Sequence, residues 1–147
     1  MPRFVGPMGI VLACVFTGGA PVLAQTAPPD LKGTWKGTGE AIVDGAHITH
    51  PRTAEAKPAG SYRLRKQEYS FRIEGQDGRR FWGTIQSENA DIPMLGSLSS
   101  DGKWIYIASR AGLIDGTVTD DDAIELCYRQ VTPAAMMVGC ADLRRQK

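Results

Sequence analysis

The most regular pattern of hydrophobic and polar positions runs through residues 31–43, where small or apolar residues alternate with polar ones. A period of two residues is that of a strand with one buried face. A tryptophan followed by two glycines on that face is typical of a strand that coils tightly at the start of a closed barrel. The residues expected to face inward are Trp35, Gly37, Gly39, Ala41 and Val43.

Beyond residue 60 the sequence predicts further strands joined by short turns. Aspartate followed by glycine at 77–78 and 101–102 indicates hairpin turns, because such turns need residues that accept a positive φ. The apolar parity changes between Leu64 and Tyr69, which predicts a bulge or a turn near 65–68. No segment repeats apolar residues at helical spacing. Strands are expected within residues 61–74, 81–87, 94–99, 104–108, 113–119, 123–131 and 136–143.

Successive strands joined by short turns favour an all-β fold, an antiparallel up-and-down barrel of about eight strands, over a Greek-key sandwich. Residues 25–147 are expected to form this barrel as one domain, because about 120 residues suffice for a single core.

The first 24 residues have the composition of a signal peptide. Arg3 gives a positive start, an apolar stretch follows, and residues 22–24 end in the small-residue spacing that signal peptidase recognises. Cleavage after Ala24 predicts a periplasmic or secreted protein. A second interpretation takes Cys14 as the lipidated residue of a lipoprotein, which would anchor the product to a membrane. No stretch is apolar and unbroken enough to predict a transmembrane helix.

Net charge argues against some classes of partner. The chain carries 17 Lys and Arg against 16 Asp and Glu, and loss of Arg3 with the leader makes the remaining domain neutral. A neutral domain without a basic tail is not expected to bind nucleic acid or an acidic membrane surface.

The last two strands can be aligned by their numbering. If Val131 pairs with Met136 across a four-residue turn, Cys127 lies directly opposite Cys140. Directly opposed residues are close enough for a disulfide, which an oxidising compartment favours. The same register predicts an outward-facing bridge and an inner face made by Ile124, Leu126, Tyr128, Gln130, Met137, Gly139, Ala141 and Leu143.

Four aromatic side chains lie on faces that are expected to point inward: Trp35, Phe71, Trp82 and Tyr128. Trp82 joins this set if the turn at 77–78 places it on the face of Phe71. An eight-stranded barrel either fills its interior with side chains or holds one small ligand. The sequence leaves both open, with the glycines on the inner face giving room for a ligand.

Residues 104–108 are apolar on both faces of a predicted strand. Pairing across the next turn places Ile105 and Ile107 inside, and leaves Trp104 and Tyr106 outside. An exposed aromatic pair indicates an interface with a second copy of the chain or another protein, unless the long loop at 44–60 covers it.

Arginines and lysines gather along one predicted hairpin. We interpret them as a solvated outer face balanced by Glu68, Glu74 and Asp77, with an anion site as the alternative. The cluster comprises Arg63, Arg65, Lys66, Arg72, Arg79 and Arg80.

Little in the sequence points to covalent or metal chemistry. His47 and His50 could share a metal, but a zinc site needs further ligands that the spacing does not supply. The aspartates at 120–122 suit a hairpin turn better than a calcium loop. Motifs for an activated nucleophile, a P-loop or a dinucleotide are absent, so no metal, cofactor or enzymatic activity is expected.

The segment Gly33-Thr34-Trp35 near the start of the domain, followed by a meander of hairpins, resembles the calycin barrels, the lipocalin and avidin group. That resemblance implies that Trp35 packs across the barrel floor and that Arg144 or Arg145 stacks on it. Avidins follow this motif with an asparagine and a serine that hold biotin. This chain has other residues at 36–39, so biotin is not the expected ligand.

Three functional hypotheses follow. The first is a barrel that binds a small apolar or amphipathic molecule between Trp35, Phe71, Trp82 and Tyr128 without covalent chemistry. The second is a structural or interaction module with a filled core. The third, an enzyme, would need the loop at 44–60 to carry its two histidines over the barrel mouth.

Overall fold

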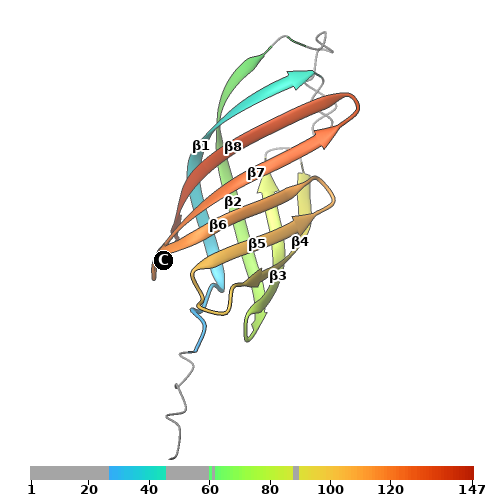
Figure 1. Cartoon of the computed structure of the whole chain (residues 1–147). Coiled ribbons are helices and arrows are strands. Elements are labelled where there is room, and N and C mark those ends of the chain that lie inside the picture. The colour runs from blue at the N-terminus through green and yellow to red at the C-terminus, as the bar shows by residue number, and fades with distance from the viewer. Residues whose placement is uncertain (1–26, 46–59, 61, 88–89) are drawn as a thin grey trace, which may run out of the picture.

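A computed structural model describes residues 27–45, 60, 62–87 and 90–147. Each strand pairs antiparallel with its neighbour in sequence, and the last pairs with the first to close the barrel (Figure 1). The all-β up-and-down barrel expected from the sequence is confirmed. Its strands are β1 (Gly33–Gly45), β2 (Arg63–Asp77), β3 (Arg80–Ser87), β4 (Ala90–Leu98), β5 (Trp104–Ser109), β6 (Leu113–Asp120), β7 (Ala123–Thr132) and β8 (Ala135–Arg145).

Several sequence predictions lie outside the described residues. They concern the leader at 1–24 with its alternative lipidation site Cys14, and the loop histidines His47 and His50. Among the described residues, no helix has the length and apolar character to cross a membrane.

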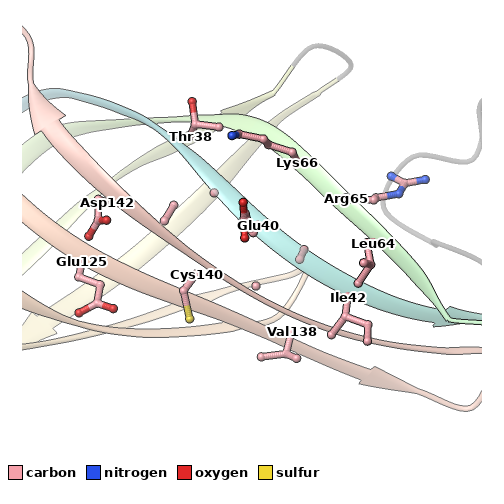
Figure 2. A pocket seen from close by; sticks show the side chains of 14 residues that line it. Thr38, Glu40, Ile42, Leu64, Arg65, Lys66, Glu125, Val138, Cys140 and Asp142 are labelled. Atoms are coloured by element: carbon pink, nitrogen blue, oxygen red, sulfur yellow. The ribbon is translucent and has the colours of Figure 1, made fainter.

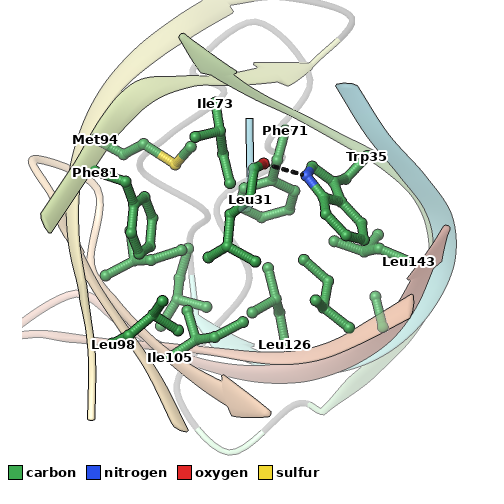
Figure 3. Close-up of a cluster of buried hydrophobic side chains, with 14 residues drawn as sticks. Leu31, Trp35, Phe71, Ile73, Phe81, Met94, Leu98, Ile105, Leu126 and Leu143 are labelled. Carbon is green, nitrogen blue, oxygen red and sulfur yellow. Dashed lines mark hydrogen bonds between the residues drawn. The ribbon is translucent and has the colours of Figure 1, made fainter. Parts of the chain in front are cut away.

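The two ends of the barrel differ, and we name them by residues that mark them. At the Leu31 end, β1 begins and β8 ends; at the Gly45 end, β1 ends and β2 begins. A packed apolar core occupies the barrel on the Leu31 side, and every one of the eight strands contributes buried side chains to it (Figure 3). Its buried members are Leu31, Trp35, Phe71, Ile73, Phe81, Met94, Leu98, Ile105, Ile107, Ile114, Ile124, Leu126, Ala141 and Leu143.

The glycines of β1 and β8 allow the two strands to approach closely. A Cβ on Gly37 would collide with the backbone oxygen of Asp142, and one on Gly39 would lie 2.6 Å from the backbone oxygen of Cys140 and 2.7 Å from the Tyr69 ring. Real Cβ atoms do not approach so closely, so glycine is required here. The expectation that these glycines leave room for a ligand is wrong, because neighbouring backbone and side chains already occupy that space.

The last hairpin has the predicted register. Val131 pairs with Met136, and Cys127 pairs with Cys140. The two cysteines form a disulfide on the outer face, with 4.0 Å between their Cα atoms. Ile124 and Leu126 are buried opposite Leu143 and Ala141, as the alternation predicted.

The second strand departs from the prediction. It pairs with β1 without interruption from Arg63 to Ile73, so no bulge or turn occurs at 65–68. The irregularity lies between Ile73 and Gly75 instead. Tyr62 and Leu64 suggested a change of parity because they are apolar, but they are 70% and 85% exposed and face outward.

Candidate functional site

Three of the four aromatics predicted to line one cavity face the barrel interior, and the fourth, Trp82, does not. Trp35 and Phe71 are 0% and 4% exposed within the packed core. Tyr128 is half-buried and donates its hydroxyl to the backbone oxygen of Ala111 at 2.7 Å. Trp82 is 46% exposed on the outer face. The proposed set of ligand contacts is therefore not assembled.

Trp82 faces outward because the hairpin before it differs from the expected one. The turn residues are 78–79 and not 77–78, so Asp77 pairs with Arg80. The bulge between Ile73 and Gly75 then places Trp82 opposite Gly75, where its ring covers the glycine. Phe81 takes the inner position and is 1% exposed. Thr84 and Gln86, which share the face of Trp82, also lie outside.

The Leu31 end is closed by the segment before β1. Leu31 inserts into the core, and the indole Nε1 of Trp35 donates to its backbone oxygen at 2.8 Å (Figure 3). The Gln76 side chain bridges this segment to β2, because its Oε1 accepts from the Leu31 amide and its Nε2 donates to the backbone oxygen of Pro29, both at 2.8 Å. These contacts hold the segment against the Leu31 end of the barrel.

The inner face near the Gly45 end is more polar. Alternate residues of β2 point into the barrel there: Arg63, Arg65, Gln67 and Tyr69. All four are half-buried, in contrast to the buried Phe71 and Ile73 that follow them. The sequence interpretation of Arg63 and Arg65 as part of a solvated outer face is wrong, since both share the face of buried Ala41 and Val43 on β1. Figure 2 shows Arg65 and outward Lys66 pointing in opposite directions.

Tyr69 lies where the polar and apolar parts of the interior meet. Its ring packs against the core and over Gly39, and its hydroxyl is enclosed without a hydrogen-bond partner. Burial raises the pKa of this phenol above its ordinary value of 10.0, while the polar Gln67 side chain, which is near the phenol but outside hydrogen-bond geometry, and the charge of Arg65 lower it. The neutral phenol thus remains an unused hydrogen-bond donor.

The two inward arginines have no inward carboxylate to pair with. Across the described strands, every Asp and Glu lies on the outer face or at an exposed strand end. Arg63 donates through Nη2 to the backbone oxygen of Gly45, and its buried Nε has no partner. Neither Arg63 nor Arg65 forms an ion pair with a described residue.

Apolar side chains accompany these polar ones. Ala41, Val43 and Met137 form a second small cluster on β1 and β8, and Tyr128 packs against both this cluster and the main core. Gln130 lies beyond Tyr128 on the same inner face of β7. The Gly45 end therefore presents a positively charged strand beside an apolar wall.

The outer surface carries a shallow groove along β1, between β2 and β8 (Figure 2). Ile42, Leu64 and Val138 line one part of it, and Glu40, Glu125 and Asp142 line the part beside the disulfide. Glu40 lies opposite Lys66 across the strand pair, which offsets part of its charge.

Outward residues, apolar except for Arg129, follow one another around the barrel along the direction of the strand hydrogen bonds. Trp104 and Tyr106 are 51% and 50% exposed beside this row, so their outward orientation agrees with the prediction. An interface role stays a prediction. In pairing order the row is Leu64, Ile42, Val138, Arg129, Leu113, Ala108, Leu95 and Trp82.

The aspartates of the β6–β7 turn serve to join strands. Asp120 pairs with Arg144, and the Oδ1 of Asp122 accepts from Nε of Arg145 at 2.9 Å. In the part of the chain that the structure describes, no three His, Cys, Asp or Glu side chains gather as a metal site.

No protein-family model and no curated protein matches this chain. Two solved structures are distantly similar. A redesigned β-barrel is 10% identical, with a TM-score of 0.41 over 80% of this chain and 92% of its own. The S-type phycobiliprotein lyase from Guillardia theta is 9% identical, with a TM-score of 0.33 over 80% of this chain and 89% of its own. The strand pairing itself defines the class: a closed, eight-stranded, up-and-down β-barrel protein.

Proposed function

We propose that this barrel binds a small amphipathic molecule, without covalent chemistry, on its inner face at the Gly45 end. The observation that carries the proposal is the division of the interior. One half is a packed core, whereas the other presents half-buried polar side chains on β2 beside apolar ones on β1 and β8. Barrels of eight strands hold one small ligand when side chains do not fill them throughout.

The lining fits a molecule with one polar and one apolar part. Tyr69, Ile85 and Tyr128 pack on the main core and form an apolar floor. Above this floor, Gln67 and Arg65 offer hydrogen-bond donors, and Met137 offers a flexible apolar contact. Most small-molecule sites combine a largely apolar lining with a few polar groups that fix orientation.

Native mass spectrometry of the folded protein, purified without a refolding step, tests this proposal first. A reproducible extra mass that is lost on denaturation is the expected result. A clean apo mass, together with no binding from a panel of anionic, neutral and cationic amphiphiles, would overturn it.

A pair of neighbouring substitutions locates the site. Gln67→Trp should block uptake by filling the inner face, whereas Glu68→Trp adds the same ring on the outer face and should leave uptake unchanged. Circular dichroism should show the same barrel in both variants. Equal uptake by the two would place the ligand elsewhere.

A second candidate function is an interaction module, which the exposed apolar row favours. Leu95 is 70% exposed and lies beside Trp82, with Trp104 and Tyr106 nearby on the same outer surface. Contiguous exposed apolar residues mark association surfaces, and we expect a second copy of the chain as the partner. Sedimentation of the wild type should show a dimer. Leu95→Asp should dissociate this dimer, whereas Lys36→Asp, at an exposed position of β1, should not. A monomer at all concentrations would remove this candidate.

A further inference from the structure

We infer that the amphipathic ligand carries a negatively charged oxygen-bearing head group, which Arg65 binds while the Tyr69 hydroxyl donates a hydrogen bond to it. This inference rests on the proposed function and narrows its ligand to anionic amphiphiles. It concerns the inner face of β2, where the sequence left an anion site as the alternative interpretation of a basic cluster that includes Arg63 and Arg65.

The inner face of β2 carries positive charge without a matching negative charge. Two guanidinium groups face the interior at the Gly45 end, and no carboxylate of the described strands faces them. A charge that is partly withdrawn from water is costly unless it is paired. A third inward arginine, Arg145, lies at the opposite end of the barrel. Its guanidinium group is paired, because it donates hydrogen bonds to Asp122 and to several backbone oxygens. Arg65 has no equivalent partner among the described residues.

The same face of β2 also carries hydrogen-bond donors without a partner. Buried polar atoms of folded proteins are almost always paired, and each exception requires an explanation. Among the described residues, the two buried side-chain atoms without a partner are the Nε of Arg63 and the hydroxyl of Tyr69. Both belong to the inward face of β2, and both can donate to an anion.

The strand geometry places these groups in a line along one inner face. Residues 65, 67 and 69 lie on one face of β2, spaced about 7 Å apart at each step of two residues. The positive charge of Arg65 acts on the Tyr69 phenol and lowers its pKa, against the larger effect of burial. Gln67 lies between them and can add a donor. Arg63 is held at the rim through its bond to the backbone oxygen of Gly45.

An apolar tail has a matching surface. The ring of Tyr69 packs on the main core, and Met137, Val43 and Ala41 cluster on the adjoining strands. A carboxylate or a phosphate head would satisfy the same donors, since both present oxygens to arginine in similar geometry. The test therefore includes both.

Isothermal titration of the folded protein, stripped of bound small molecules without unfolding, compares four probes of one tail length: laurate, lauryl phosphate, lauryl alcohol and laurylamine. Laurate or lauryl phosphate should bind about 10- to 100-fold more tightly than the alcohol, because a hydrogen bond to a charged group is lost with the neutral head. The tighter of the two anions identifies the head group. The amine should bind more weakly still. Equal binding of anion, alcohol and amine would overturn the inference and leave the proposed function standing.

Substitutions test whether the preference for an anionic head group depends on Arg65. Arg65→Gln should weaken anion binding by about 10- to 100-fold and leave alcohol binding unchanged, and Arg65→Lys should recover part of the loss. The matched control is Lys66→Gln, which removes one positive charge from the adjacent outward position. An equal effect of Arg65→Gln and Lys66→Gln would contradict a specific inner contact.

The Tyr69→Phe variant distinguishes a role of the hydroxyl in ligand binding from a role in stability. The hydroxyl has no partner in the unliganded protein, so its removal should leave stability without ligand unchanged or slightly higher. Anion affinity should nevertheless fall by about threefold to tenfold. A loss of stability with unchanged affinity would show that the phenol serves the fold and not the ligand.

Discussion

The guanidinium carbon of Arg145 lies 4.3 Å from the centre of the Trp35 ring. The same side chain donates to the backbone oxygens of Asp30 at 2.7 Å and Asp121 at 3.0 Å. It thereby connects the segment before the first strand, the β6–β7 turn and the last strand. Of the two candidates that the calycin resemblance offered, Arg145 and not Arg144 takes the stacking position.

Arg145→Ala should lower the free energy of unfolding by about 2 to 4 kcal/mol, because a cation–π contact and several charge-assisted hydrogen bonds are lost together. The side chain is only 22% exposed, so solvent screens these contacts weakly. Urea denaturation measures the change. Arg144→Ala is the control, since its exposed ion pair with Asp120 should contribute less than about 1 kcal/mol. Equal losses of unfolding free energy in the two variants would show that Arg145 stabilises the barrel no more than an exposed ion pair does.

Adjacent aromatics on β3 should respond very differently to truncation. Phe81→Ala should cost about 3 to 5 kcal/mol, because it empties a site in the packed core beside Gly96. Trp82→Ala should cost about 1 kcal/mol, since that ring is half-exposed on the outer face, where it covers Gly75. Thermal unfolding distinguishes the two. A larger loss at Trp82 would mean that the hairpin has the register expected from its sequence alone.

Removing the disulfide should weaken the barrel without opening it. Cys127 and Cys140 are 13 residues apart, so the bridge closes a short loop and should contribute roughly 2 to 3 kcal/mol. The bridge lies outside the core, so the doubly substituted Cys127→Ser, Cys140→Ser protein should keep its circular dichroism spectrum. Urea unfolding with and without reductant checks the size of the effect. Complete unfolding on reduction would contradict this account.

Alkaline pH should reveal the enclosed phenol of Tyr69. Burial raises its pKa above the ordinary value of 10.0, so the folded protein holds this proton more tightly than the unfolded chain does. Stability should therefore fall as the pH rises from about 10 toward the raised value. Unfolding measured across this range should show the decline in the wild type and a smaller one in Tyr69→Phe. Identical curves would argue that the phenol is solvated.

The sequence predicted much of the barrel from local rules. Alternation defined the first strand, and numbering across the last hairpin gave the register of Cys127 with Cys140. It also gave the outward orientation of Trp104 and Tyr106. These predictions succeeded because a short turn fixes the register, and a period of two then assigns every side chain to a face.

Hairpin β2–β3 shows where such rules fail. Apolar Tyr62 and Leu64 lie outside, and charged Arg63 and Arg65 lie inside, so hydrophobicity assigned the wrong face at the start of this strand. A turn displaced by one residue and a bulge after Ile73 then placed Trp82 outside. A single-residue shift reverses every later side chain, and nothing local in the sequence reports it.

Local patterns along the chain were enough to predict the architecture, because alternating strands, short turns and one pair of opposed cysteines are local properties. Which side chains lie inside the barrel depends instead on contacts between strands. The continuous pairing of β1 with β2 turns Arg65 and Tyr69 inward, and the approach of β1 to β8 takes up the space that Gly37 and Gly39 had suggested for a ligand. The physical reason is closure, because each strand's inner face is set by its register with both neighbours at once.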